Sequence, residues 1–243
     1  MQEALTLHDA RGRAALGRAL LEGPHLLDEA RRAGVQVERV FALADDAASA
    51  AAARACGAEL VVVEERVLRR LATTEHPQSP VAVMMIPPAG PLPAGHLLVA
   101  WEVRDPGNVG TLLRSAAAFG LGFAFGPGTA DPWAPKVVRA AAGGHFRAGA
   151  AQVKALDDLR AGGRLRVATV VRGGSPPWAL PAGPLAILVG DEARGLAPEV
   201  VAACDLAVTI PMPGGAESLN AAMAGAIMAY EVSRKGSPAG ASP

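Results

Sequence analysis

Apolar residues recur along the chain at two spacings, one typical of helices and one typical of short buried strands. Up to residue 86, helical spacing predicts helices at Leu5–Leu21, Pro24–Ala33, Ala47–Cys56 and Glu64–Leu71. Shorter apolar runs predict strands at Val37–Leu43, Glu59–Val63 and Val81–Ile86. Helices that alternate with strands in this way indicate a small α/β sandwich.

Beyond residue 95 the alternation is more regular. Strands are expected at Leu97–Val103, Phe123–Phe125, Leu165–Val171, Ala186–Val189 and Ala207–Ile210, and helices at Val109–Phe119, Pro135–Ala142, Pro198–Ala203 and Leu219–Arg234. Most of these strands are continuous apolar runs, as parallel strands covered by helices on both faces are. The pattern predicts an open α/β fold whose ligand site lies at the carboxyl ends of a parallel sheet.

The segment Pro87–Gly95 separates the two regions. Its four prolines and two glycines are incompatible with regular structure and typical of a linker. We therefore expect a domain over residues 1–86, a linker over 87–95, a second domain over 96–236 and a flexible tail over 237–243.

Composition narrows the class of protein. The formal net charge of zero argues against a protein that coats nucleic acid by bulk charge, but it allows a local basic face. Cys56 and Cys204 are far apart and fit neither a disulfide framework nor a zinc site, so no metal is expected. No apolar run reaches the roughly 20 residues of a membrane span, and no signal core is visible, so a cytoplasmic protein is expected.

The first of three strand-end loops with candidate chemistry follows the strand Leu97–Val103. Asp105-Pro106-Gly107 turns the chain, and Asn108 opens a helix that carries Arg114 two turns later. Taken alone, Asn108 fits a helix N-cap. An arginine inside an apolar helix must extend to solvent or bind an anion.

The second loop follows the buried strand Ala186–Val189 and begins Gly190-Asp191-Glu192. Gly190 allows the backbone to approach another group closely. Taken alone, the two carboxylates fit a solvated turn.

The third loop runs from Thr209 to Asn220 through a stretch rich in proline and glycine. Either Glu217 or Ser218 could cap the helix that follows. Small residues between Asn220 and Ala229 allow that helix to pack closely against another, in a dimer face or a crowded core.

In this order and spacing, the loops resemble the motifs of the SpoU/TrmH family of the SPOUT methyltransferases, over residues from about 97 to 234. The matching residues are Asn108, Gly110, Arg114, Gly190, Glu192, Gly195, Leu196, Ile210, Pro211, Met212, Ser218, Leu219 and Asn220. The resemblance implies a C-terminal α/β SPOUT domain with a parallel sheet and a deep trefoil knot. The first region, with Leu21-Glu22-Gly23, resembles the family's small N-terminal RNA-binding domain, which is itself similar to a ribosomal protein.

The resemblance also implies the chemistry, which is methylation of a ribose 2′-hydroxyl in RNA by S-adenosylmethionine. The residues expected to bind the cofactor are Gly190, Ile210, Met212, Ser218 and Leu219. The expected catalytic residues are Asn108, Arg114, Glu192, Ser218 and Asn220. Because a guanidinium stays protonated in proteins, we interpret Arg114 as an anchor for RNA phosphate and for developing alkoxide charge, not as a base.

The family further implies a homodimer that acts on RNA, with neither DNA nor a membrane as partner. The tRNA-specific branch generally lacks a globular N-terminal domain, which favours rRNA, and 23S rRNA in particular. A tRNA ribose methyltransferase and a non-catalytic RNA-binding protein of the same fold remain alternatives. The absence of a Gly-x-Gly-x-x-Gly loop argues against a nicotinamide-dependent enzyme.

The role of Arg114 generates a testable prediction. The variant Arg114→Ala is expected to bind S-adenosylmethionine like the wild type and to lose methyl transfer to RNA, because only the anion anchor is removed. Calorimetry of cofactor binding and incorporation of labelled methyl groups measure the two effects. Near-normal turnover in the variant would contradict the assignment.

Overall fold

The computed structural model of the chain describes residues 1–236, so the predicted tail over 237–243 lies outside the described residues. The chain divides into two compact units. The first comprises Met1–Pro88 together with Asp131–Phe146, and the second comprises Ala89–Ala130 and the residues from Arg147 onward. Residues 131–146 therefore group with the first unit, although they lie within the region expected to form the second domain. The segment Pro87–Gly95 contains neither helix nor strand.

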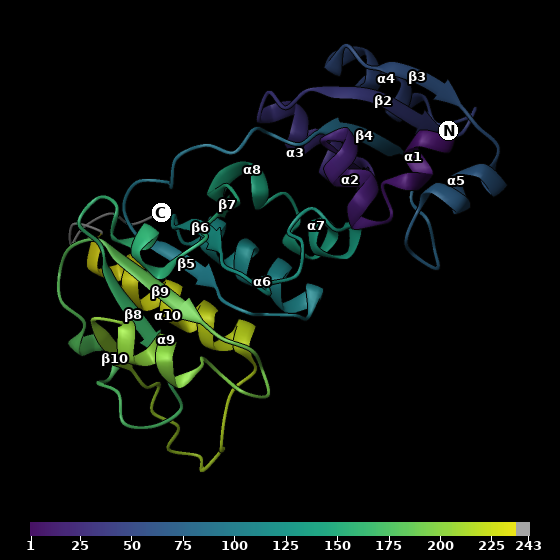
Figure 1. The fold of residues 1–243 in the computed structure, drawn as a ribbon. Coiled ribbons are helices and arrows are strands. Elements are labelled where there is room, and N and C mark those ends of the chain that lie inside the picture. Colours follow the sequence, from purple (N-terminus) through teal and green to yellow (C-terminus); the bar gives the residue numbers. More distant parts are fainter. Residues whose placement is uncertain (237–243) are drawn as a thin grey trace. The chain divides into compact units, whose positions relative to one another are not determined.

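The first unit is built on a four-stranded mixed sheet in the order β1-β4-β2-β3. Its elements are α1 (Gln2–Thr6), α2 (Ala10–Leu16), β1 (Arg18–Glu22), α3 (Pro24–Arg32), β2 (Val37–Ala42), α4 (Ala47–Cys56), β3 (Glu59–Val62), α5 (Glu65–Leu71), β4 (Val81–Met85) and α7 (Pro135–Ala141). Strand β4 runs antiparallel to β1 and β2, whereas β3 runs parallel to β2. Strands β2, β3 and β4 of this sheet are labelled in Figure 1.

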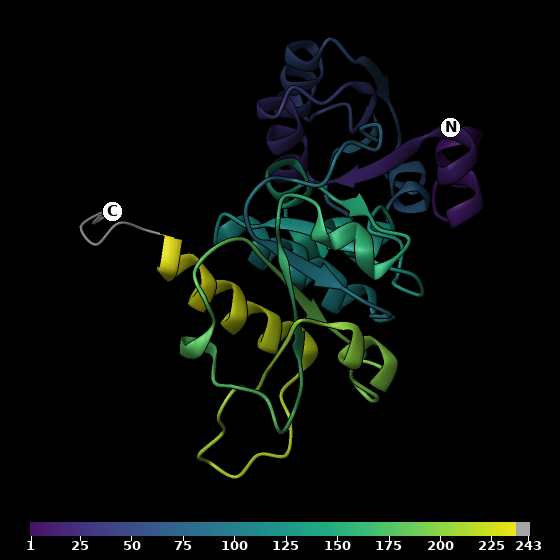
Figure 2. The same cartoon turned by 60° about the vertical axis from the view of Figure 1, so that its left-hand side comes forward.

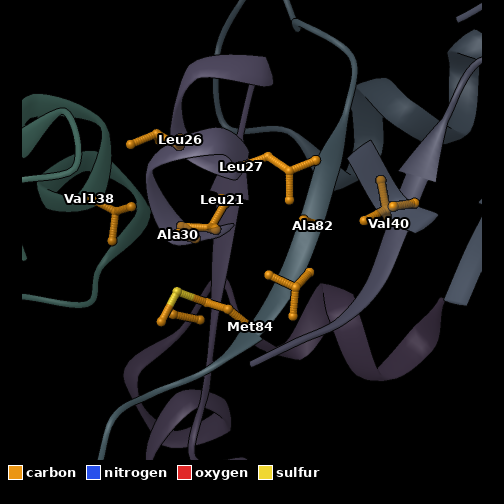
Figure 3. Packing of buried hydrophobic residues seen from close by; sticks show 11 residues of the cluster. Leu21, Leu26, Leu27, Ala30, Val40, Ala82, Met84 and Val138 are labelled. Atoms are coloured by element: carbon orange, nitrogen blue, oxygen red, sulfur yellow. The ribbon is translucent and has the colours of Figure 1, made fainter. Parts of the chain in front are cut away.

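Both faces of this sheet are covered, because successive residues of a strand point to opposite sides. Ala82 and Met84 of β4 pack with the helix residues Leu27 and Ala30 in one cluster, which Figure 3 shows. Val81 and Val83 of the same strand belong to a second cluster with α1 and α5. Each fully buried leucine or valine side chain adds roughly 1.5–3 kcal/mol to the free energy of unfolding. The α/β sandwich predicted from the sequence is therefore confirmed.

The single helix predicted over Leu5–Leu21 is wrong, because α1 ends at Thr6, α2 begins at Ala10 and the residues from Arg18 onward form a strand. Helix α2 is capped by the carboxylate of Asp9, which accepts from the backbone N–H of Gly12 at 2.8 Å. It ends at Gly17, whose φ of 63° is left-handed, and the next residues form β1. Ala19, Leu20 and Leu21 are buried between the two helix layers, so they form a continuous apolar run without the alternation that marks a half-buried strand.

Arg13 ties the segment Asp131–Phe146 to the rest of the first unit, and His145 closes the segment on itself. The guanidinium of buried Arg13 donates to the Asp131 carboxylate through Nε and Nη2, at 2.8 and 2.6 Å. The Nε2–H of His145 donates to the carbonyl of Pro132 at 2.7 Å. Burial lowers the pKa of His145 to about 4, so the imidazole is neutral near neutral pH.

The second unit is built on a six-stranded sheet in the order β10-β8-β9-β5-β6-β7, in which every pairing is parallel. Its elements are β5 (Leu97–Ala100), α6 (Pro106–Ala118), β6 (Gly122–Phe125), β7 (Ala151–Gln152), the 3-10 helix η1 (Leu156–Arg160), β8 (Leu165–Thr169), the 3-10 helix η2 (Pro177–Ala179), β9 (Leu185–Val189), α9 (Pro198–Ala203), β10 (Leu206–Val208) and α10 (Ala221–Gly236). The helix α8 (His145–Ala148) spans the boundary between the units. The predicted parallel sheet is confirmed, and the trefoil knot stays a prediction.

Helices α6 and α10 cover one face of this sheet, against β5 and β9 (Figure 2). The two helices approach closely at Gly225, where an added Cβ would lie 2.1 Å from Cδ2 of Leu112. The small residues at the start of α10 therefore serve a crowded core within the chain. Within residues 1–236, no helix combines the length and the apolar character needed to cross a membrane.

Candidate functional site

A cavity of about 240 Å³ lies at the carboxyl ends of β8, β9 and β10, the position expected for a ligand site in a parallel sheet. It is lined by Thr169, Val170, Val171, Val189, Gly190, Asp191, Glu192, Ala193, Arg194, Gly195, Val208, Ile210, Met212, Ser218, Leu219, Ala221 and Ala224. All of these residues belong to the second unit. The cavity therefore joins three strand ends to the beginning of α10.

All five residues expected to bind a cofactor line this one cavity: Gly190, Ile210, Met212, Ser218 and Leu219. Most of the other lining side chains are apolar. The backbone N–H groups of Ile210 and Leu219 donate no hydrogen bond to any residue that the structure describes. An apolar pocket with a few free backbone donors suits a flat, uncharged heteroaromatic ring.

The loop after β9 is a tight turn that needs glycine at its first position. A Cβ on Gly190 would lie 2.4 Å from the carbonyl carbon of Gly195 and 2.5 Å from the nitrogen of Leu196. The backbone N–H of Gly195 donates to the carbonyl of Asp191 at 2.8 Å and closes the turn. The close approach expected at Gly190 is thus to the loop's own backbone.

Asn108 links the three loops through its side-chain amide. Its Nδ2 donates to Oε1 of Glu192, and its Oδ1 accepts from Nδ2 of Asn220 at 3.1 Å. The N-cap of α6 is Asp105, whose carboxylate accepts from the backbone N–H of Asn108 at 2.9 Å. The interpretation of Asn108 as the helix N-cap is therefore wrong. Its side-chain amide instead forms hydrogen bonds with residues of the other two loops.

Asn220 has a second role at the start of α10. Its Oδ1 accepts from the backbone N–H groups of Ala222 and Met223 at 2.9 and 3.2 Å, which are the bonds of an N-cap. Glu217 and Ser218, the two candidates for that cap, do not make these bonds. Ser218 is exposed and lines the cavity.

Arg114 is exposed on α6 and forms no hydrogen bond or ion pair with another residue in the described part of the chain. Of the five expected catalytic residues, Glu192 and Ser218 line the cavity, whereas Asn108, Arg114 and Asn220 do not. Asn108 and Asn220 are joined to Glu192 by hydrogen bonds, while Arg114 is joined to none of them. Its guanidinium therefore has its donors free for an anion.

Sequence reasoning missed two parts of the site. Thr169, the last residue of β8, lines the cavity together with Val170 and Val171, because β8 lies between β9 and β10 in the sheet. No short motif marks them, and only the strand order would have revealed them. Arg194 was also missed, although it lies inside the second loop. Among residues 1–236, no group of three or more His, Cys, Asp or Glu side chains could hold a metal ion.

These features define an α/β protein with a small-molecule cavity at the carboxyl edge of a parallel sheet, next to a hydrogen-bonded set of polar side chains. Residues 95–230 match the SpoU rRNA Methylase family, and the chain belongs to this family. Residues 1–82 match the MRM3-like substrate binding domain. The family resemblance inferred from the three loops is therefore confirmed.

Individual relatives agree with the family over nearly the whole chain. The 23S rRNA (guanosine(2553)-2'-O)-methyltransferase RlmP of Bacillus subtilis is 32% identical, over 93% of this chain and 92% of its own. The structure of the SpoU methyltransferase AviRb from Streptomyces viridochromogenes with AdoMet has a TM-score of 0.87 and 27% identity over 96% of each chain. An AdoMet-bound rRNA methyltransferase from Sinorhizobium meliloti has a TM-score of 0.84 and 28% identity, over 96% of this chain and 93% of its own.

The geometry at Gly190 generates a prediction about cofactor binding. In Gly190→Ala the new methyl group meets backbone, so the loop must shift, and we expect binding of S-adenosylhomocysteine to weaken by about tenfold or more, on the order of 1.4 kcal/mol. The matched control is Gly214→Ala, because a Cβ at that position meets nothing within 4 Å. Calorimetry on both variants, with thermal melts to verify folding, measures the difference. Wild-type affinity in folded Gly190→Ala would refute the proposed tightness of the turn.

Proposed function

We propose that this protein transfers a methyl group from S-adenosylmethionine to a ribose 2′-hydroxyl of ribosomal RNA. Membership of the SpoU family and the relatives that act on rRNA support this proposal. The observation that carries it is the convergence of the five expected cofactor-binding residues on one strand-end cavity. The bonded side chains of Glu192, Asn108 and Asn220 connect that cavity to the first and third loops.

The cavity fits the cofactor's nucleoside. S-adenosylmethionine supplies, when bound, a methyl group on a sulfonium that a ribose oxygen can attack in line. Apolar side chains such as those of Ile210 and Leu219 would enclose the adenine. The free backbone N–H groups of these two residues would donate to the adenine ring nitrogens or to the ribose. Because the nucleoside carries no pyrophosphate, the site needs no glycine-rich phosphate loop.

The five expected catalytic side chains would divide the remaining roles. Arg114, exposed and without a partner among the described residues, would bind an RNA phosphate and stabilise negative charge that develops on the ribose oxygen. Asn108 and Asn220 would hold Glu192 in place and orient the ribose, with Ser218 at the cavity wall. A guanidinium cannot take up a proton, so Arg114 acts through its charge, and the proton of the ribose hydroxyl passes to water.

The first region, over residues 1–86, is proposed as the domain that binds the RNA substrate, with the catalytic domain over residues 96–236. Its match to a substrate binding domain supports this division and favours rRNA, 23S rRNA in particular, over tRNA. Two of its arginines are occupied within the protein, Arg13 by Asp131 and Arg18 by Glu3 and Glu38. RNA contacts would therefore fall to other exposed residues, such as Arg11.

A homodimer is the proposed assembly, with the active site completed across the interface. An apolar stripe on α10 supports it, because Met223, Ile227 and Tyr230 follow helical spacing and are 62%, 38% and 48% exposed. The Tyr230 ring also contacts Phe119, at 5.7 Å between centroids. A second copy of the chain would cover this stripe.

The dimer proposal predicts that Ile227→Glu shifts the protein to a monomer, because a carboxylate would be buried in the apolar interface. Light scattering of the wild type and the variant at assay concentrations measures the effect. The control is Arg66→Glu, an exposed position on α5 in the first unit. A wild-type monomer that still methylates RNA would contradict the proposal.

The proposed reaction is tested by incubating the protein and tritiated S-adenosylmethionine with rRNA, ribosomal particles and tRNA. Label is expected in rRNA, at a linkage that resists alkaline hydrolysis, because a methylated 2′-oxygen cannot attack the neighbouring phosphate. The Arg114→Ala variant provides the background. Label confined to tRNA would refute the assignment of rRNA as the substrate. Label in alkali-sensitive linkages would refute the ribose 2′-oxygen as the methylated atom.

A further inference from the structure

Arg194 is the single basic residue among those that line the cavity in the described part of the chain. It lies in the turn after β9, two residues beyond Glu192, and its side chain is exposed. Within residues 1–236 its guanidinium forms no hydrogen bond or ion pair. An unpaired guanidinium at the wall of a ligand cavity is free to bind an anionic part of the ligand.

The turn holds Arg194 in place through its backbone. The carboxylate oxygen Oδ1 of Asp191 accepts from the N–H groups of Ala193 and Arg194 at 3.0 and 3.2 Å. The N–H of Gly195 donates to the carbonyl of Asp191, so residues 191 to 195 form a closed turn. The backbone of Arg194 is thus fixed without a ligand, so ligand binding needs to order only its side chain.

Charges of both signs meet at this wall of the cavity, because Asp191 and Glu192 line it together with Arg194. One oxygen of each carboxylate is already used, for the turn and for Asn108 respectively. A binding site for nucleic-acid phosphates is expected to have several basic residues close together, and this wall of the cavity has only one among the residues that the structure describes. Neighbouring acidic and basic groups instead complement a zwitterion.

We propose that Arg194 binds the carboxylate at the amino-acid end of S-adenosylmethionine, with the acidic residues of the same turn facing the ammonium group. This inference rests on the proposed function, because it assumes that the nucleoside occupies the apolar part of the cavity. A guanidinium presents paired N–H donors that match the two oxygens of a carboxylate. The pair lies at an exposed position, so its contribution is modest.

The test compares two ligands that differ only in the carboxylate, S-adenosylhomocysteine and its decarboxylated analogue. In Arg194→Gln, calorimetry is expected to show the affinity for S-adenosylhomocysteine falling by about three- to fivefold, the upper range for an exposed ion pair. The affinity for the decarboxylated analogue is expected to stay within about twofold of the wild type, since that ligand has no group for Arg194 to bind. Arg172→Gln is the matched control, because Arg172 is an exposed arginine of the β8 loop that does not line the cavity, and both affinities should be unchanged.

Arg194→Lys serves as a second variant and should retain part of the preference for the carboxylate, through its charge alone. Equal losses for both ligands in Arg194→Gln, or no loss for either, would overturn the inference while leaving the proposed function intact. Weaker RNA binding with unchanged S-adenosylhomocysteine affinity would also overturn it and would assign Arg194 to the substrate. A wild-type protein that binds neither ligand would overturn the proposed function itself, and this inference with it.

Discussion

The shared direction of the six strands is the constraint on which the second unit depends. Parallel strands have all their carboxyl ends at one edge, and β8, β9 and β10 are neighbours there. Loops that are far apart in the sequence therefore border one cavity. The hydrogen bonds of Asn108 to Glu192 and Asn220 add a cross-link between helices α6 and α10 and the turn after β9. Sheet direction brings the loops together, and a single amide joins them.

Much of this arrangement could be predicted from sequence, because the order and spacing of the three loops resemble a known family, although each loop taken alone fits an ordinary cap or turn. The structure supplies a local physical reason at some of these positions. Gly190 is required by a turn with no room for a Cβ, and Ile210 and Leu219 by an apolar cavity wall. The contribution of β8 could not be predicted, because strand order depends on contacts between distant segments. Strand β1 was mistaken for helix for a related reason, since burial on both faces removes the periodicity that distinguishes a strand.

Several side chains at the site support local structure and the ligand region at once. Asn220 caps α10 with its oxygen and bonds Asn108 with its nitrogen, while Asp191 closes its turn and lines the cavity. If replacing either residue lowered activity, the loss could not be divided between a distorted loop and a missing contact to the ligand. Substitutions that change one atom are more informative here, because an aspartate at position 220 keeps the capping oxygen and removes the donor.

The grouping of residues 131–146 with the first unit has a consequence for dissecting the protein. Val138 is almost fully buried in the cluster formed with Leu21, Leu26 and Ala30, and Trp133 and Phe146 pack against that cluster. A fragment that begins after residue 88 would expose these apolar side chains and leave Asp131 without its guanidinium partner. Cutting the gene at the proline-rich segment would therefore not yield a soluble catalytic fragment by itself. Such a fragment would also need polar substitutions at the apolar positions of residues 131–146 that the first unit buries.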